Sequence, residues 1–257
     1  MTRQKAIAAL LCAAALTACD YEKNAVQDIT GFTPVAGIRF FNFGVNAPGV
    51  NFYANDTKMT AISSATGTES TNGTTSGGAG SGGFYDAIAP GSYAFTAKIA
   101  AATDKDLAIT SVTSPIADAK FYSYYVSGFY DAATKKADAF VVEDAFPAQI
   151  DFSVAYIRFV NAISNSTPQT LFVKNSVGVE VPIGGGVAYK AASAFIPLPS
   201  GVYDLATRTA GSATNAIART AVSFSGGRVY TIGSRGDMTI VSTTAATRPQ
   251  LDFTSNR

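Results

Sequence analysis

The sequence predicts an all-β protein, and three observations support this prediction. Short runs of β-branched and aromatic residues alternate with Gly, Pro, Asn and Asp along the chain, which is typical of strands joined by turns. Charged residues make up 14% of the chain, whereas about 25% is usual, and Ser, Thr, Asn and Gly occupy the polar positions instead. We find no segment with convincing helical periodicity.

Residues 1–18 are predicted to be a signal peptide. Two cations, Arg3 and Lys5, precede an Ala- and Leu-rich stretch over residues 6–15, which is the order of regions in a secretory signal. The apolar stretch is too short to cross a bilayer, which takes about 20 apolar residues. No later segment is long and apolar enough to serve as a stop-transfer helix, so we expect the mature chain to be translocated whole.

The sequence Leu-Thr-Ala-Cys at residues 16–19 resembles the bacterial lipobox, in which the cysteine is acylated before the signal peptidase cuts. We therefore expect cleavage after Ala18 and lipidation of Cys19; an ordinary signal peptide with a chance cysteine is the alternative. Several acyl chains on one residue anchor a protein stably. Asp20 at the next position is compatible with the periplasmic side of the inner membrane and also with the outer membrane or cell surface.

The mature chain is expected to be nearly neutral and free of thiols. Removal of residues 1–18 takes away two of the 19 basic residues and none of the 18 acidic ones. The remaining Lys and Arg are scattered, which argues against nucleic acid as a partner. Cys12 is lost with the signal peptide and Cys19 carries the lipid, so no internal disulfide can form. Stability must therefore come from the burial of apolar surface.

After the anchor, the chain is expected to contain a tether and two β-rich domains. The tether covers residues 19–34, and the domains cover 35–146 and 153–257, with Pro147 interrupting strand pairing at the join. A Ser-, Thr- and Gly-rich segment, 66–83, is predicted to be a flexible loop because it lacks apolar residues. The strands expected in the first domain are residues 38–43, 50–54, 84–88, 93–99, 107–113, 121–129 and 139–142.

Short motifs recur in the same order in both predicted domains, which indicates a tandem repeat. Ile-Arg-Phe-Phe-Asn at 38–42 returns as Ile-Arg-Phe-Val-Asn at 157–161. The alternation of a strand places Ile and Phe on one face and Arg on the other. Arg39 and Arg158 are therefore expected to lie over the outer face of a sheet or to pair with a carboxylate.

Turns that precede later strands recur as well. Pro-Gly-Ser-Tyr ends at Tyr93 and Pro-Ser-Gly-Val-Tyr ends at Tyr203, and both tyrosines resemble corner tyrosines whose hydroxyl bonds back to the backbone. Together with the Ile-Arg-Phe-x-Asn strand and Gly-Gly-Arg-Val-Tyr-Thr at 226–231, these motifs resemble the bacterial domain of unknown function 4397. The resemblance covers about residues 36–145 and 155–243, and the second segment is the better match.

This resemblance implies two tandem antiparallel immunoglobulin-like β-sandwich domains in an exported or lipid-anchored protein. The family has no established catalytic residues, so no activity is carried over to this chain. In the family, the Asn of the Ile-Arg-Phe-x-Asn strand is usually followed by Ser/Ala-Pro-Asp-Ala-Pro. In the first copy this sequence is replaced by Phe-Gly-Val-Asn-Ala-Pro at 43–48.

The residue types leave few routes to catalysis. The chain contains no His, which removes the commonest general base and transition-metal ligand. A pair of carboxylates, as in glycoside hydrolases, is the best remaining route. Glu143 and Asp144 are adjacent and point to opposite faces if extended, so we expect solvated charges rather than a catalytic pair. Asp104-Lys105-Asp106 lacks the further oxygen ligands of a calcium loop. We therefore predict no enzyme activity, no cofactor and no metal site.

The aromatic run at 121–125 supplies the one predicted binding surface. Alignment of the two copies places Tyr122 and Tyr124 in the core, so Phe121 and Tyr125 are expected on the outer face. Exposed aromatic side chains can stack on sugar rings or fill a protein interface. Packing under the flexible loop or against the second domain is the alternative.

The sequence thus favours a membrane-anchored, non-catalytic binding or structural module. Its expected partners are the membrane, through the lipid, and an envelope protein or glycan. A carbohydrate-active or other envelope hydrolase with paired carboxylates is the alternative function.

Overall fold

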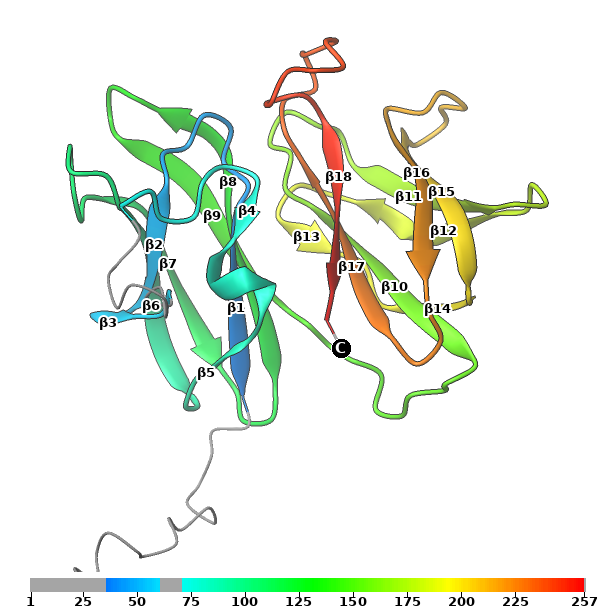
Figure 1. Cartoon of the computed structure of the whole chain (residues 1–257), viewed down its shortest axis with the longest axis horizontal. Helices are drawn as coiled ribbons and strands as arrows, with labels where there is room; N and C mark the ends of the chain where they lie inside the picture. Colours follow the sequence, from blue (N-terminus) through cyan, green and yellow to red (C-terminus); the bar gives the residue numbers. More distant parts are fainter. Residues whose placement is uncertain (1–35, 61–70, 257) are drawn as a thin grey trace, which may run out of the picture. The chain divides into compact units, whose positions relative to one another are not determined.

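The computed structural model describes residues 36–60 and 71–256 (Figure 1). Over these residues the chain forms strands β1–β18 and one 3₁₀ turn, η1 (Gly80–Gly83), so the all-β prediction is confirmed. No helix in the described ranges is long and apolar enough to span a membrane. The predicted signal peptide, Ala18, Cys19 and the tether lie outside the described residues. The described residues all fall within one compact unit.

The first pair of sheets, here called the first sandwich, contains β1–β9. One sheet has the order β4-β1-β8-β9, with β5 also paired to β1, and the other has the order β3-β2-β6-β7. Strands β1 and β8 run parallel, and the other neighbours are antiparallel. The strands are β1 (Gly37–Asn42), β2 (Val50–Ala54), β3 (Thr57–Lys58), β4 (Gly78–Ala79), β5 (Asp86–Ala87), β6 (Gly91–Ile99), β7 (Ala108–Ile116), β8 (Phe121–Asp131) and β9 (Lys136–Glu143).

The second sandwich, β10–β18, follows the same plan. Its sheets have the orders β13-β10-β17-β18, with β14 also on β10, and β12-β11-β15-β16. Again one pair, β10 and β17, runs parallel. The strands are β10 (Val154–Asn161), β11 (Gln169–Asn175), β12 (Glu180–Val187), β13 (Ala191–Ala192), β14 (Ile196–Pro199), β15 (Gly201–Thr209), β16 (Ile217–Phe224), β17 (Val229–Arg235) and β18 (Gln250–Ser255).

The inward faces of the strands are those that the alternation predicts. Ile38 and Phe40 on β1 lie in the core of the first sandwich, together with Tyr122 and Tyr124 on β8. In the second sandwich the corresponding β10 and β17 residues fill the core in the same way. Alternating burial of apolar side chains therefore fixes which face of each strand points inward.

Both predicted corner tyrosines are confirmed. The Tyr93 hydroxyl donates to the Ala89 carbonyl at 2.9 Å, and the Tyr203 hydroxyl donates to the Pro199 carbonyl at 2.8 Å. Each bond ties the start of a long strand back to the turn before it.

The segment predicted to be a flexible loop, residues 66–83, is described from residue 71 onward, where it contains β4 and η1; residues 66–70 lie outside the described ranges. Strand β4 pairs with β1. Gly80 is buried, and a Cβ at that position would lie 3.2 Å from the Phe52 ring. Because glycine has no side chain, this backbone can approach the core closely and form ladder hydrogen bonds without apolar residues of its own.

A third apolar cluster joins the two sandwiches. It contains Phe41, Phe43, Tyr125 and Phe140 from the first sandwich and Val160 and Ala162 from the second. The connecting residues 144–153 contain no strand. The outer face of sheet β4-β1-β8-β9 is therefore packed against the second sandwich rather than exposed to solvent.

Candidate functional site

Two arginines at equivalent places in β1 and β10 meet at this junction. Arg39 and Arg158 point away from the cores of their own sandwiches, and both are fully buried. Asp144, which follows β9, is 2% exposed and lies within salt-bridge distance of both guanidinium groups. The predicted pairing with a carboxylate is confirmed, whereas the prediction that Asp144 is solvated is wrong. Glu143 is exposed, as expected, and pairs with Lys120 at 2.8 Å.

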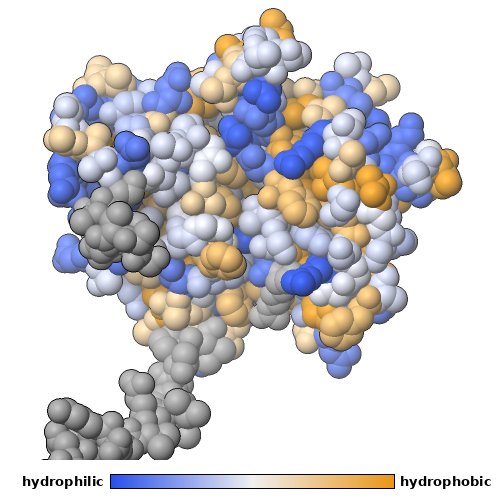
Figure 2. Space-filling view, in the orientation of Figure 1, coloured by the Kyte–Doolittle hydropathy of each residue, from blue (hydrophilic) through white to orange (hydrophobic). Residues whose placement is uncertain are grey.

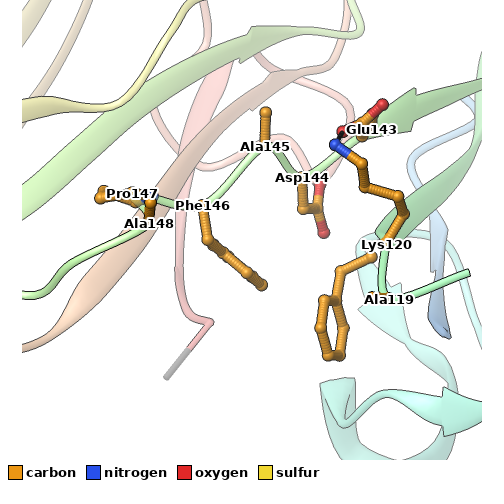
Figure 3. A pocket seen from close by; sticks show the side chains of 9 residues that line it. Ala119, Lys120, Glu143, Asp144, Ala145, Phe146, Pro147 and Ala148 are labelled. Carbon is orange, nitrogen blue, oxygen red and sulfur yellow. Dashed lines mark hydrogen bonds and ion pairs between the residues drawn. The ribbon is translucent and has the colours of Figure 1, made fainter. Parts of the chain in front are cut away.

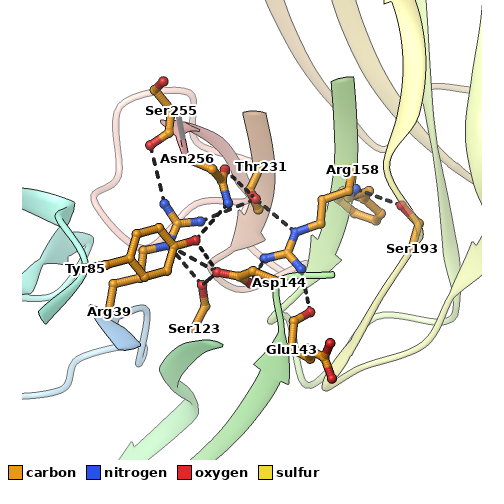
Figure 4. Close-up of polar contacts among 11 residues, drawn as sticks. Arg39, Tyr85, Ser123, Glu143, Asp144, Arg158, Ser193, Thr231, Ser255 and Asn256 are labelled. Atoms are coloured by element: carbon orange, nitrogen blue, oxygen red, sulfur yellow. Dashed lines mark hydrogen bonds and ion pairs between the residues drawn. The ribbon is translucent and has the colours of Figure 1, made fainter. Parts of the chain in front are cut away.

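The Asp144 carboxylate is satisfied on both oxygens (Figure 4). Its Oδ1 accepts a hydrogen bond from Arg158 Nη2. Its Oδ2 accepts from the Ser123 hydroxyl at 2.7 Å and from the Tyr85 hydroxyl, and it lies 3.6 Å from Arg39 Nε. Arg39 Nε also donates to Ser123 Oγ at 2.9 Å. We call these five residues, with Thr231 and Asn256, the junction cluster.

Each arginine donates a hydrogen bond to a backbone carbonyl at the end of the last strand of the other sandwich. Arg158 Nη1 donates to the Glu143 carbonyl at the end of β9, at 2.9 Å. Arg39 Nη1 donates to the Ser255 carbonyl at the end of β18, at 3.4 Å. The two guanidinium groups also share Thr231, whose hydroxyl accepts from Arg158 Nε at 2.9 Å and from Arg39 Nη2 at 3.4 Å.

Aromatic rings cover both guanidinium groups in equivalent ways. The Arg39 guanidinium carbon lies 4.8 Å from the centroid of the Tyr85 ring, and that of Arg158 lies 4.8 Å from the Phe195 ring. Tyr85 precedes β5 and Phe195 precedes β14, the strands that pair with β1 and β10. Because a cation is attracted to an aromatic face, both contacts favour the buried positive charges.

Asp144, which follows β9, and Asn256, which follows β18, make equivalent contacts in the two sandwiches, but one is a carboxylate and the other an amide. The Asp144 amide donates to the Phe121 carbonyl at 2.6 Å, and the Asn256 amide donates to the Val229 carbonyl at 2.7 Å. The Asn256 side-chain oxygen accepts from Thr231 at 2.9 Å, as Asp144 accepts from Ser123. An amide therefore stands at the place that a carboxylate occupies on the other side, so a single carboxylate faces two arginines.

Burial and the neighbouring carboxylate keep Tyr85 protonated. Desolvation raises the pKa of its hydroxyl, and the Asp144 charge raises it further, against the opposing effect of Arg39. The hydroxyl therefore remains a donor to Asp144 at any ordinary pH. It also accepts a hydrogen bond from the Asn256 amide at 3.1 Å.

Asp86, next to Tyr85, gives a testable pH dependence. Burial raises the pKa of this carboxyl to about 6, compared with about 4 in an unfolded chain. A raised pKa favours folding below pH 4, and the contribution is lost as the pH rises to 6. Since Asn mimics the protonated acid, Asp86→Asn should exceed wild type in free energy of unfolding by about 1 kcal/mol above pH 6, after allowance for partial exposure.

The measurement is urea denaturation of both proteins at pH 3.5 and pH 7.5. The gain should be absent at the lower pH. Asp56→Asn, at an exposed turn of the same sandwich, is the matched control and should change stability little. A gain of equal size at both pH values would contradict the proposed cause.

Phe121 and Tyr125, the two aromatic residues predicted to bind a ligand, pack against other aromatic rings and do not form an exposed patch. Tyr125 is 1% exposed and stacks on Phe41 and Phe140, with ring centroids 4.8 and 5.1 Å apart. Phe121 is half-buried against Tyr85, at 5.1 Å between centroids. The prediction of an exposed surface is therefore wrong for Tyr125, and the alternative of packing against the second sandwich is confirmed.

The junction opens to solvent at a shallow cavity of about 280 Å³ beside the connecting segment (Figure 3). Its charged walls are Lys120 and Glu143, which pair with each other, and Asp144, whose oxygens are used within the junction cluster. No group of three or more His, Cys, Asp or Glu side chains is gathered for a metal within the described ranges.

The fold and the junction cluster define the chain as an all-β protein with two sandwich-like sheet pairs joined by a buried charge cluster. Residues 155–255 match the model of a family described as Domain of unknown function (DUF4397). The chain therefore contains a DUF4397 domain, and this match runs from β10 to the last residue of β18. No curated protein matches the chain.

Proposed function

We propose that the protein is a bacterial envelope lipoprotein in which two tandem DUF4397-type sandwiches act as one non-catalytic binding or structural module. The observation that carries this proposal is the junction cluster. Asp144, Arg39 and Arg158 are buried and bonded to one another, so they are used to hold the sandwiches together rather than to act on a substrate.

The tandem arrangement is supported by the matching register of the parallel strand pairs. Ile38 lies opposite Tyr122 in β1 and β8, and Ile157 lies opposite Tyr230 in β10 and β17. The arginine that follows each isoleucine then lies opposite Ser123 or Thr231. Equivalent residues with equivalent partners favour duplication of one domain within the chain.

The alternative, an envelope hydrolase, needs two carboxylates that face a common substrate. Glu143 and Asp144 are the adjacent acidic residues at the cavity beside the connecting segment. The first pairs with Lys120 and the second is held by Arg158, an arrangement that favours a structural role over acid–base chemistry. For a non-catalytic module, an envelope protein or a glycan is the proposed partner.

Cys19→Ser should abolish both fatty-acid incorporation and membrane association. The reason is that the thiol is the proposed site of acylation, and no other cysteine remains after cleavage. The measurement is metabolic labelling with a fatty acid, followed by membrane fractionation. Cys12→Ser is the matched control because it changes only the signal peptide and should keep the label. A wild-type protein without label would contradict the lipoprotein proposal. In parallel, protease treatment of intact cells distinguishes the two possible locations: cleavage indicates the cell surface, and protection indicates the periplasm.

A further inference from the structure

The described chain begins at one end of the strands, close to an exposed phenylalanine. Gly37 donates its amide to the Lys120 carbonyl at 3.0 Å, so β1 and β8 start side by side. A Cβ on Gly37 would lie 2.9 Å from the Phe121 ring and 3.2 Å from Tyr85. The residue before Tyr85 is Phe84, and its side chain is 77% exposed.

A second exposed phenylalanine lies at the same end. Phe152, in the connection that leads into β10, is 82% exposed. Its ring lies 2.6 Å from the position that a Cβ would take on Gly227, in the turn before β17. The next residue, Arg228, lines a cavity of about 270 Å³ together with Phe84. Phe84, Arg228 and Phe152 thus form one continuous surface across both sandwiches, which we call the basal surface.

The basal surface combines two exposed phenylalanine rings with charged side chains around them. Lys120 pairs with Glu143, and Asp151 accepts hydrogen bonds from the backbone and hydroxyl of Ser153. Arg228 is an exposed cation. Figure 2 shows apolar side chains at the lower margin of the molecule, below the place where β10 and β17 begin in Figure 1. Exposed aromatic rings beside a cation are suited to the interface of a lipid bilayer.

The proposed lipid anchor indicates which partner the basal surface contacts, namely the membrane. Residues 20–35 separate Cys19 from the first described residue, Ala36, and such a segment spans at most about 60 Å when fully extended. The chain enters the fold beside Phe121 and Tyr85, at the basal surface. We propose that the basal surface docks on the bilayer that holds the lipid, with the rings of Phe84 and Phe152 in the interface. This proposal rests on the proposed lipidation of Cys19.

Single tryptophans can test the docking because the chain contains none. Phe84→Trp and Phe152→Trp place a fluorophore on the basal surface. Val241→Trp is the matched control: Val241 is 95% exposed and lies in the loop after β17, at the opposite end of that strand from Arg228. Each lipidated variant is reconstituted into phosphatidylcholine vesicles, with and without bromine on the acyl chains.

We expect brominated lipid to quench the emission of Phe84→Trp and Phe152→Trp, with a shift to shorter wavelength, and to leave Val241→Trp unchanged. All three substituted positions are solvent-exposed, and unchanged unfolding midpoints will show that the variants fold. If the lipidated protein floats with vesicles but its basal tryptophans are quenched no more than the control, docking is overturned while the anchor stands. If mass spectrometry finds no lipid on Cys19, the anchor and the docking proposal both fail.

Discussion

Asp144→Asn should lower the free energy of unfolding by about 3–5 kcal/mol, because it leaves two buried guanidinium groups without a compensating charge. Arg39 and Arg158 are fully buried, and Asp144 is the carboxylate that lies within salt-bridge distance of both. The measurement is urea denaturation of the Cys19→Ser chain, with intrinsic tyrosine fluorescence and circular dichroism as probes.

Glu143→Gln is the matched control for this substitution. Glu143 is the adjacent residue, carries the same charge and is exposed in its pair with Lys120. Exposed ion pairs contribute little, so the control should change stability by less than about 1 kcal/mol. Equal losses for Asp144→Asn and Glu143→Gln would mean that the junction cluster does not stabilise the fold.

Tyr125→Ala should have the second largest effect, a loss of about 3–5 kcal/mol, since it removes a large buried ring from a packed cluster. The ring stacks on Phe41 and Phe140, and the same cluster contains Val160 of the second sandwich. Aromatic stacking adds to the loss beyond the buried area. Thermal or urea unfolding measures it.

Phe129→Ala, in the same strand, is the matched control because Phe129 is exposed. Its effect should stay below about 1 kcal/mol. A similarly small effect of Tyr125→Ala would contradict the packing of Tyr125 between the sandwiches and would restore the predicted aromatic binding surface.

The strands and their inward faces could be predicted because they follow from local pattern. The predicted strand at residues 50–54 coincides with β2, and the predicted inward parity of Tyr122 and Tyr124 is confirmed. Alternation assigns a residue to a face, however, and says nothing about what covers that face. Arg39 and Tyr125 were correctly assigned to the outer face, but their burial depends on contacts with a second sheet that is distant in sequence.

The junction cluster could be predicted only in part. The sequence predicts that the arginines pair with a carboxylate, but it does not predict that this carboxylate is the buried Asp144. Tyr85 and Asn256 belong to none of the recurring motifs. They bond to each other, and their other side-chain partners in the cluster, Asp144 and Thr231, are distant in sequence. Glu143-Asp144 and Ser255-Asn256 occupy equivalent positions in the two sandwiches, but their residue types differ, so the sequence does not reveal the equivalence. The equivalence emerges from the pairing of β9 with β8 and of β18 with β17.

The central claim is that the junction cluster and the apolar cluster beside it make the two sandwiches one cooperative unit. Differential scanning calorimetry of the Cys19→Ser chain tests this claim most directly. We predict a single transition whose calorimetric enthalpy equals the van't Hoff enthalpy, and loss of that coincidence in Asp144→Asn. Two separate transitions in the parent chain, each of about half the total enthalpy, would contradict the claim and show that the sandwiches unfold independently.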